Sequence, residues 1–191
     1  MSPFSYGVLL ISLTVCQFSL CLNVPECPEG CFCTKKTTEN IPGGIGFKIT
    51  CRPTNTAKGT FEIRLPPSTI NLDLTNYGLK KIELDDFSGL VNLQKLDLQG
   101  NAIETIEPGS FRSLPKLEIL DLSRNSLQWI EQNTFVGLAS LQKLKLTDNN
   151  IRTIREGSFA ELRSLKKVCI VIIVSTLKIN TEILTEILSS N

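Results

Sequence analysis

The chain has 191 residues, with 20 lysines and arginines against 19 aspartates and glutamates, which leaves a net charge of +1. This length suits one domain with a short appendage, and the balanced, interspersed charge predicts no nucleic-acid partner. The chain has no histidine, so the commonest general base, Ser-His and Cys-His pairs and His-containing zinc sites are all excluded. We therefore expect no catalytic residue, no metal and no cofactor, and do not expect an enzyme.

The N-terminus begins with an apolar run over residues 7–22, which has the length of a signal peptide. Ser19 and Cys21 would place small residues at −3 and −1 of a cleavage site. The segment before the run has no Lys or Arg, so an uncleaved anchor is the alternative, but a run interrupted by Ser, Thr and Gln is short for a membrane span. We expect residues 1–22 to be a signal peptide, and the chain to be secreted or extracellular without a membrane span. A longer form could be anchored at the cell surface.

Four clustered cysteines come after the apolar run: Cys27, Cys31, Cys33 and Cys51. In an exported chain such an even set indicates disulfides, although the spacing alone leaves three pairings open. A four-thiolate zinc site is the competing interpretation, but its usual pair of C-x₂-C motifs is absent. Residues 41–46, IPGGIG, are typical of a turn between two strands. We expect residues 23–68 to form a cap that covers the open strand edge of the domain beginning at residue 69, with residues 48–51 paired to the first strand of that domain.

From residue 69 the chain repeats itself at a fixed interval. The same slots hold Leu96, Leu120 and Leu144, then Asn101, Asn125 and Asn149, then Phe111, Phe135 and Phe159. A fixed period with the pattern L-x-x-L-x-L-x-x-N-x-L is the signature of a solenoid. We predict four repeats, at residues 69–92, 93–116, 117–140 and 141–164.

Each repeat predicts one coil of that solenoid. Leu96 and Leu98 alternate with Asp97, as in a short strand with one buried face, and the chain then bends and returns through a looser arm. An inward-pointing Asn has both a donor and an acceptor, so it can satisfy backbone groups at the bend. In the first coil Tyr77 occupies this slot, which predicts an altered corner.

The motif over residues 93–162 resembles the typical 24-residue leucine-rich repeat of extracellular proteins, and the cysteine cluster resembles their N-terminal cap. The resemblance implies an α/β solenoid, a leucine-rich repeat horseshoe with parallel strands on the concave face and a mostly irregular convex side. It also implies a capping β-hairpin with the disulfides Cys27–Cys33 and Cys31–Cys51. Proteins of this kind hold a protein ligand on the concave face, in receptors, adhesion molecules and innate immune sensors.

Residues 165–191 begin a fifth repeat that then degenerates, with Ile173 in the Asn slot and Ser175 in a leucine slot. The β-branched run here is too short for a membrane span and suits a strand. Cys169 is left over, which suggests a free thiol or an intermolecular bond. We expect a truncated isoform or a gene-model artefact, the alternative being an unusual but adequate cap. An exposed end of this kind could also join two copies of the chain as a homodimer.

The predicted ligand-binding residues point outward from the strands of the concave face: Asp73, Thr75, Lys95, Asp97, Gln99, Ile119, Asp121, Ser123, Lys143 and Lys145. Three aspartates on adjacent strands, about 4.8 Å apart, could share a cation. We expect instead that they keep the strand soluble. The early coils look acidic and the late ones, with Lys166 and Lys167, basic; a protein ligand or receptor of complementary charge is the expected partner. A polyanion at the basic end is a weaker alternative.

Trp129 occupies a slot that should point outward on the return arm, where a single apolar residue is unremarkable. No N-x-[ST] sequon occurs, so no N-glycan shields any face. The predicted function is an extracellular protein-binding module. The alternatives are a structural matrix protein, or a truncated soluble isoform that acts as a decoy.

Overall fold

The computed structural model describes residues 27–39, 41, 43–53, 59, 61 and 63–169. In these residues it has the following strands: β1 (Cys31–Thr37), β2 (Ile45–Cys51), β3 (Thr69–Asp73), β4 (Lys81–Ile82), β5 (Lys95–Asp97), β6 (Thr105–Ile106), β7 (Ile119–Asp121), β8 (Trp129–Ile130), β9 (Lys143–Lys145), β10 (Thr153–Ile154) and β11 (Lys167–Cys169). The predicted signal peptide and the chain after Cys169 lie outside the described residues.

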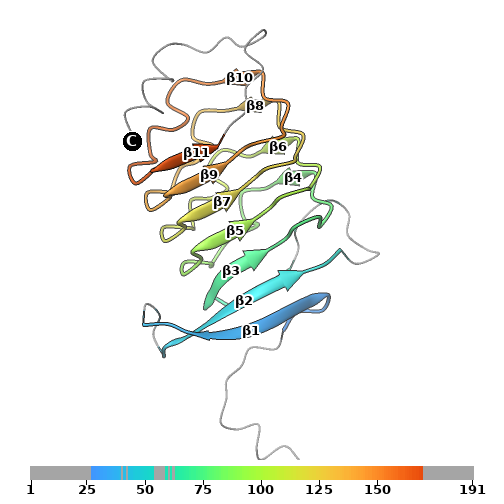
Figure 1. Ribbon diagram of the computed structural model, residues 1–191, viewed down its shortest axis with the longest axis vertical. Helices are drawn as coiled ribbons and strands as arrows, with labels where there is room; N and C mark the ends of the chain where they lie inside the picture. The colour runs from blue at the N-terminus through green and yellow to red at the C-terminus, as the bar shows by residue number, and fades with distance from the viewer. Residues whose placement is uncertain are drawn as a thin grey trace, which may run out of the picture.

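One sheet organises the molecule, with the strand order β1-β2-β3-β5-β7-β9-β11 (Figure 1). From β3 onward neighbouring strands are parallel, and paired residues are equivalent positions of successive repeats, as in Leu72↔Leu96 and Leu120↔Leu144. The predicted solenoid is confirmed, because each coil contributes one strand to the same sheet. The degenerate fifth repeat also begins with a paired strand, β11.

The return arms form the other side of each coil. Two short pairs of parallel strands, β4–β6 and β8–β10, lie there, and each pairs equivalent residues of successive repeats. Turns make up most of the remainder. The convex side is thus mostly irregular, as predicted. Over the described part of the chain it consists of turns and two-residue strands, with no helix.

A column of phenylalanine rings fills the core between the two sides. Phe87, Phe111, Phe135 and Phe159 stack with centroid distances of 5.9, 6.4 and 5.6 Å. Phe61, which precedes the repeats, adds a ring 5.9 Å from Phe87. All of these side chains are buried, and the cap segment continues the column by one ring.

The asparagine slot works as expected at the bends. Asn101 Oδ1 accepts hydrogen bonds from the N–H groups of Gly78 (2.8 Å) and Leu79 (3.0 Å). Its Nδ2 donates to the carbonyls of Leu74 (3.0 Å) and Leu98 (2.8 Å). Asn125 and Asn149 repeat this arrangement one and two coils later, where the N–H groups of Ile103 and Leu127 donate to their Oδ1 atoms. Each amide therefore ties its own coil to the preceding one.

The first corner is altered, also as predicted. Tyr77 fills the asparagine slot, is buried, and packs edge-to-face on Phe61 at 6.0 Å. The backbone of the corner is not altered, because Asn76 is left-handed with φ of 55° and Gly100, Arg124 and Asp148 are left-handed at the same position of the later coils. The corner of the first coil thus packs against the ring of Phe61 from the cap, where later coils pack against a preceding repeat.

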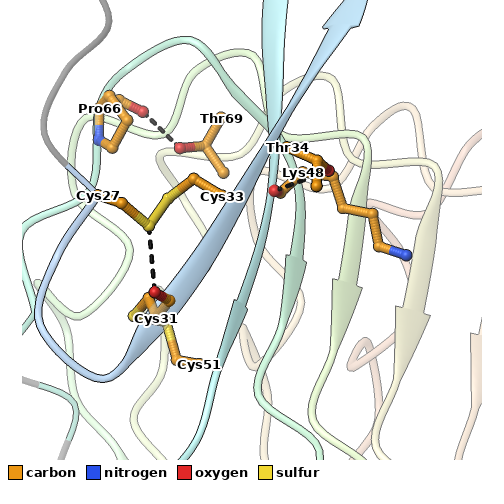
Figure 2. The surroundings of a disulfide bond; sticks show 8 residues. All are labelled: Cys27, Cys31, Cys33, Thr34, Lys48, Cys51, Pro66 and Thr69. Carbon is orange, nitrogen blue, oxygen red and sulfur yellow. Dashed lines mark hydrogen bonds between the residues drawn. A yellow bond between two sulfur atoms is a disulfide. The ribbon is translucent and has the colours of Figure 1, made fainter.

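The cap is a β-hairpin whose second strand joins the solenoid. β1 and β2 are antiparallel, and β2 runs parallel to β3 with Lys48↔Asn71 and Thr50↔Asp73. Figure 2 shows the disulfides Cys27–Cys33 and Cys31–Cys51 at the start of β1, as the resemblance implied. The turn is shorter than predicted, because residues 45 and 46 belong to β2. A Cβ on Gly46 would lie 2.8 Å from Ile70, so glycine permits the close approach of β2 to β3.

Candidate ligand-binding face

The concave face carries two rows of side chains in register across the strands. The aspartate row, with one residue per strand, is Phe32, Thr50, Asp73, Asp97, Asp121, Lys145 and Cys169. The lysine row is Thr34, Lys48, Asn71, Lys95, Ile119, Lys143 and Lys167. Alternation along each strand puts both rows on the side opposite the leucine core. The predicted ligand-binding residues of successive strands are thereby brought together, and both rows continue onto the cap hairpin.

Eight of the ten predicted ligand-binding residues have exposed or half-buried side chains on this face, and two do not. Asp121 and Ser123 are only 3% and 4% exposed. Lys145 on the next strand donates to Asp121 Oδ2 at 2.6 Å, and Thr147 Oγ1 donates to Ser123 Oγ at 3.0 Å. Lys145 and Thr147, one coil later, therefore cover Asp121 and Ser123. The two buried residues hold Lys145 and Thr147 in position and offer little surface to a ligand.

Burial by itself raises the pKa of Asp121. Hydrogen bonds from the Lys145 ammonium and from Ser123 outweigh burial and bring the pKa below its ordinary value. The same pair raises the pKa of Lys145. At neutral pH the two groups are an ion pair set into the sheet, not two independent surface charges.

The other two aspartates also have partners. Asp97 Oδ2 lies 3.5 Å from Lys95 Nζ, and Asp73 Oδ1 accepts a hydrogen bond from Thr75 N–H at 3.0 Å. Burial raises the pKa of Asp73, but the bonds from Thr75 and the charges of Arg52 and Lys48 lower it overall. No group of three His, Cys, Asp or Glu residues in the described chain is placed to hold a metal ion.

The charge distribution on this face differs from the predicted gradient. We expected the early coils to be acidic, but Lys48 and Arg52 of the cap lie near Asp73, and Lys95 lies beside Asp97. Lys48 of β2 and Arg52, which follows it, come from the cap and are not part of the repeat pattern. The late end is basic as expected, with Lys143 and Lys167 side by side on β9 and β11.

Phe32 is a surface residue that the sequence reasoning missed. It is 71% exposed and pairs with Thr50, so it lies at the cap end of the aspartate row. The exposure of Phe32 could have been predicted from the sequence. Cys31 and Cys33 both turn toward the core, so the residue between them must face outward. Trp129 is 44% exposed on β8 of the return arm, away from the concave face, as predicted.

A cavity of about 910 Å³ lies beside the first coil, on the side of the return arm. Its lining combines apolar residues such as Phe61 and Leu84 with the carboxylates of Glu83, Asp86 and Glu107. Burial raises the pKa of Asp86, and the negative charges of Glu83 and Glu107 act in the same direction. The predicted ligand-binding residues do not line it.

Comparison with known proteins fits this geometry. The family described as leucine rich repeat matches residues 67–127 and 115–168, which together make up more than half of the chain. The protein therefore belongs to the leucine-rich repeat family. No significant match was found among curated proteins.

Two solved structures are similar to this chain. One is TLR13 in a complex with ssRNA13, at 28% identity and a TM-score of 0.62, over 82% of this chain and 21% of that one. The other is the Drosophila Toll–Spatzle complex, at 27% identity and a TM-score of 0.51, over 55% of this chain and 15% of that one. The chain thus spans about a fifth or less of the length of each receptor chain that it matches.

These comparisons correct one expectation. From the near-neutral composition we expected no nucleic-acid partner, but TLR13, which has the same fold, is in a complex with ssRNA13. Net charge averages over the whole chain, whereas a ligand meets only one face, so composition does not decide this point. Regarding membranes, no helix among the described residues is long and apolar enough to cross a bilayer.

Proposed function

We propose that this protein is an extracellular binding module that holds a protein ligand on its concave face. The observation that carries the proposal is the open surface formed by the aspartate and lysine rows, where charged side chains from successive strands stand in register. Such a surface offers many weak contacts in a fixed geometry, which suits a macromolecule better than a small substrate. The absence of histidine from the whole sequence supports a binding role over catalysis.

The residues proposed to contact the ligand are those of the predicted set that remain accessible: Asp73, Thr75, Lys95, Asp97, Gln99, Ile119, Lys143 and Lys145. Asp121 and Ser123 contribute by positioning Lys145 and Thr147. The Toll–Spatzle complex is a precedent for a protein ligand and the TLR13 complex for RNA. We favour a protein, because partly exposed carboxylates of the aspartate row would repel a nucleic-acid backbone.

Two disulfides in so short a cap support the extracellular assignment, because they persist in oxidising compartments. With this location we retain the proposed division of the chain: a signal peptide at residues 1–22, a cap at 23–68, four repeats at 69–164 and an atypical end at 165–191.

An engineered glycan tests the concave face directly. The chain has no natural sequon, and Asp73→Asn creates one, Asn-Leu-Thr, ending at Thr75. The matched control is Arg152→Thr, which creates Asn-Ile-Thr beginning at the exposed Asn150 beyond the bend. Both variants and the wild type are secreted from mammalian cells and tested against an array of purified extracellular proteins.

We expect the wild type and glycosylated Arg152→Thr to capture the same proteins, and glycosylated Asp73→Asn to lose them. The double variant Asp73→Asn/Thr75→Ala has no sequon, so it separates loss of the carboxylate from the bulk of the glycan. Capture that survives a glycan at position 73 would contradict the proposal.

A further inference from the structure

The lysine row has a regular spacing that continues from the repeats onto the cap hairpin. Lys48 lies on β2, Lys95 on β5 and Lys143 on β9, so lysines occupy every second strand of the sheet, and Lys167 follows on β11. Because adjacent strands lie about 4.8 Å apart, the backbone positions of successive lysines are about 10 Å apart. Asn71 and Ile119 occupy the strands between them.

The charge of this row is largely unneutralised. Among the described residues, Lys48, Lys143 and Lys167 form no ion pair, and Lys95 has a loose one, 3.5 Å from Asp97. The carboxylate nearest the basic end, Asp121, is buried and held by Lys145. Lys143 and Lys167 are therefore free to meet anionic groups of a partner, and Lys48 and Lys95 have only weak interactions with Asp73 and Asp97 that such groups would compete with.

We propose that the concave face receives an extended, acidic segment of a partner protein, which crosses the strands along the lysine row. In a polyproline II conformation a chain rises about 3.1 Å per residue with three residues per turn, so carboxylates three residues apart lie on one face about 9 Å apart and match Lys48, Lys95 and Lys143. This inference rests on the proposed function and specifies the chemistry of the partner. The residues between the carboxylates would meet Asn71 and the apolar side chain of Ile119.

The aspartate row favours a peptide over a polyanion. It runs parallel to the lysine row, two residues away along each strand, which is about 7 Å. Asp73 and Asp97 are only half-buried there. A nucleic acid or sulfated glycosaminoglycan is wider than an extended peptide and carries a negative charge on nearly every unit, so some of these charges would meet the carboxylates, whereas an extended peptide can direct its acidic side chains to the lysines alone.

The test uses fluorescein-labelled peptides and the full chain, followed by fluorescence anisotropy at low and physiological salt. One peptide repeats Glu-Gly-Ser, a second has the same composition with its glutamates in one block, and a third has Gln in place of Glu. We expect the spaced peptide to bind most tightly and the Gln peptide not to bind. Block and spaced peptides that bind equally would overturn the three-residue register.

The variant Lys48→Gln/Lys95→Gln/Lys143→Gln should weaken binding of the spaced peptide about tenfold, since each exposed ion pair contributes up to about fivefold. A control with the same loss of charge is Lys35→Gln/Arg152→Gln/Arg163→Gln, whose residues are exposed outside both rows. The control should bind like the wild type after added salt has screened long-range attraction.

Two further outcomes separate this inference from the proposed function. If a glycan at position 73 abolishes protein capture while the triple lysine variant retains it, the concave face binds a protein but not through acidic residues, and the inference fails alone. If both variants retain capture, both proposals fail. If a single-stranded RNA or a heparin oligosaccharide binds the lysine row more tightly than the spaced peptide, the partner is a polyanion and the proposed protein segment is wrong.

Discussion

At the residue scale, the asparagines show why a polar side chain can be buried in every coil. Asn125 is only 9% exposed, yet its amide accepts from Ile103 N–H and donates to the carbonyls of Leu98 and Leu122. These backbone groups lie at a bend, where neither sheet ladder can reach them. A buried backbone group without a partner costs about 1 to 3 kcal/mol, so the asparagine is required by the bend itself.

Asn125→Ala should therefore lower the free energy of unfolding by about 3 kcal/mol, because several buried backbone groups lose their partner. Urea denaturation followed by circular dichroism measures the change. The matched control is Asn150→Ala, which removes the same amide from an exposed position and should stay within about 0.5 kcal/mol of the wild type. Similar losses in both variants would show that the amide bonds at the bend are not what stabilises the coil.

The Asp121–Lys145 pair makes stability depend on pH. The pKa of folded Asp121 lies below its ordinary value of 3.8, so the unfolded chain binds the proton more readily than the folded one. The contribution of the carboxylate is therefore complete above about pH 4 and is lost as the pH falls through the folded-state pKa.

Asp121→Ala should cost about 1.5 to 3 kcal/mol at pH 7, where the charged hydrogen bonds to Lys145 and Ser123 are intact. The gap between variant and wild type should narrow as the pH is lowered from 4 to 2. Denaturation curves over this range measure it, with the exposed Glu118→Ala as the control. A gap that does not change with pH would mean that Asp121 acts through packing rather than charge.

At the scale of the elements, the concave strands of the repeats are only three to five residues long. A strand of this length has no independent stability, so the coils depend on neighbours on both sides. The phenylalanine column supplies part of this coupling, because each ring contacts the rings of the preceding and following coils. Loss of one ring should therefore affect more than its own coil.

Phe111→Ala should lower the free energy of unfolding by about 3 to 5 kcal/mol, the range for large core truncations. Phe111 is fully buried between Phe87 and Phe135. Phe32→Ala is the control, since that ring is 71% exposed and should change stability by less than about 0.5 kcal/mol. Thermal unfolding followed by calorimetry distinguishes the two, and equal effects would contradict the packing described above.

At the scale of the whole molecule, the cap closes the N-terminal end of an open structure. Without β2, the edge of β3 and the apolar face beneath it would be exposed to water, which promotes aggregation. Phe61 and the buried residues Phe47 and Ile49 of the hairpin complete the first coil. The disulfides hold this small hairpin, which lacks a core of its own.

Cys31→Ser/Cys51→Ser should lower stability by about 3 kcal/mol, because the bond closes a loop with a sequence separation of 20. Cys169→Ser is the control, since that thiol is half-buried and forms no disulfide in the described chain. Under reducing conditions the wild type should lose at least as much stability as the double variant, because reduction also opens Cys27–Cys33. If reductant leaves the wild type unchanged, the hairpin is stable without its sulfur bonds.

Much of this architecture follows from the repeat pattern. The fixed period places equivalent side chains at equivalent points of every coil, so the burial of Leu96, Phe111 and Asn101 is predicted together with that of their counterparts. The cap pairing followed from the family resemblance, because spacing alone left three arrangements open. The repeat rule stops where repetition stops, which is why the turn of the hairpin and Phe32 were missed.

By itself, the sequence determined the coil, its register and the residues that face the core, because these depend only on position within the repeat. The tertiary structure alone decided which charges on the concave face remain available. Asp121 is paired with Lys145 because β9 lies beside β7, and the register of β2 on β3, with Lys48 beside Asn71, puts Lys48 in the lysine row. Both effects arise between residues far apart in the chain, where only the packing of strands brings the charges together.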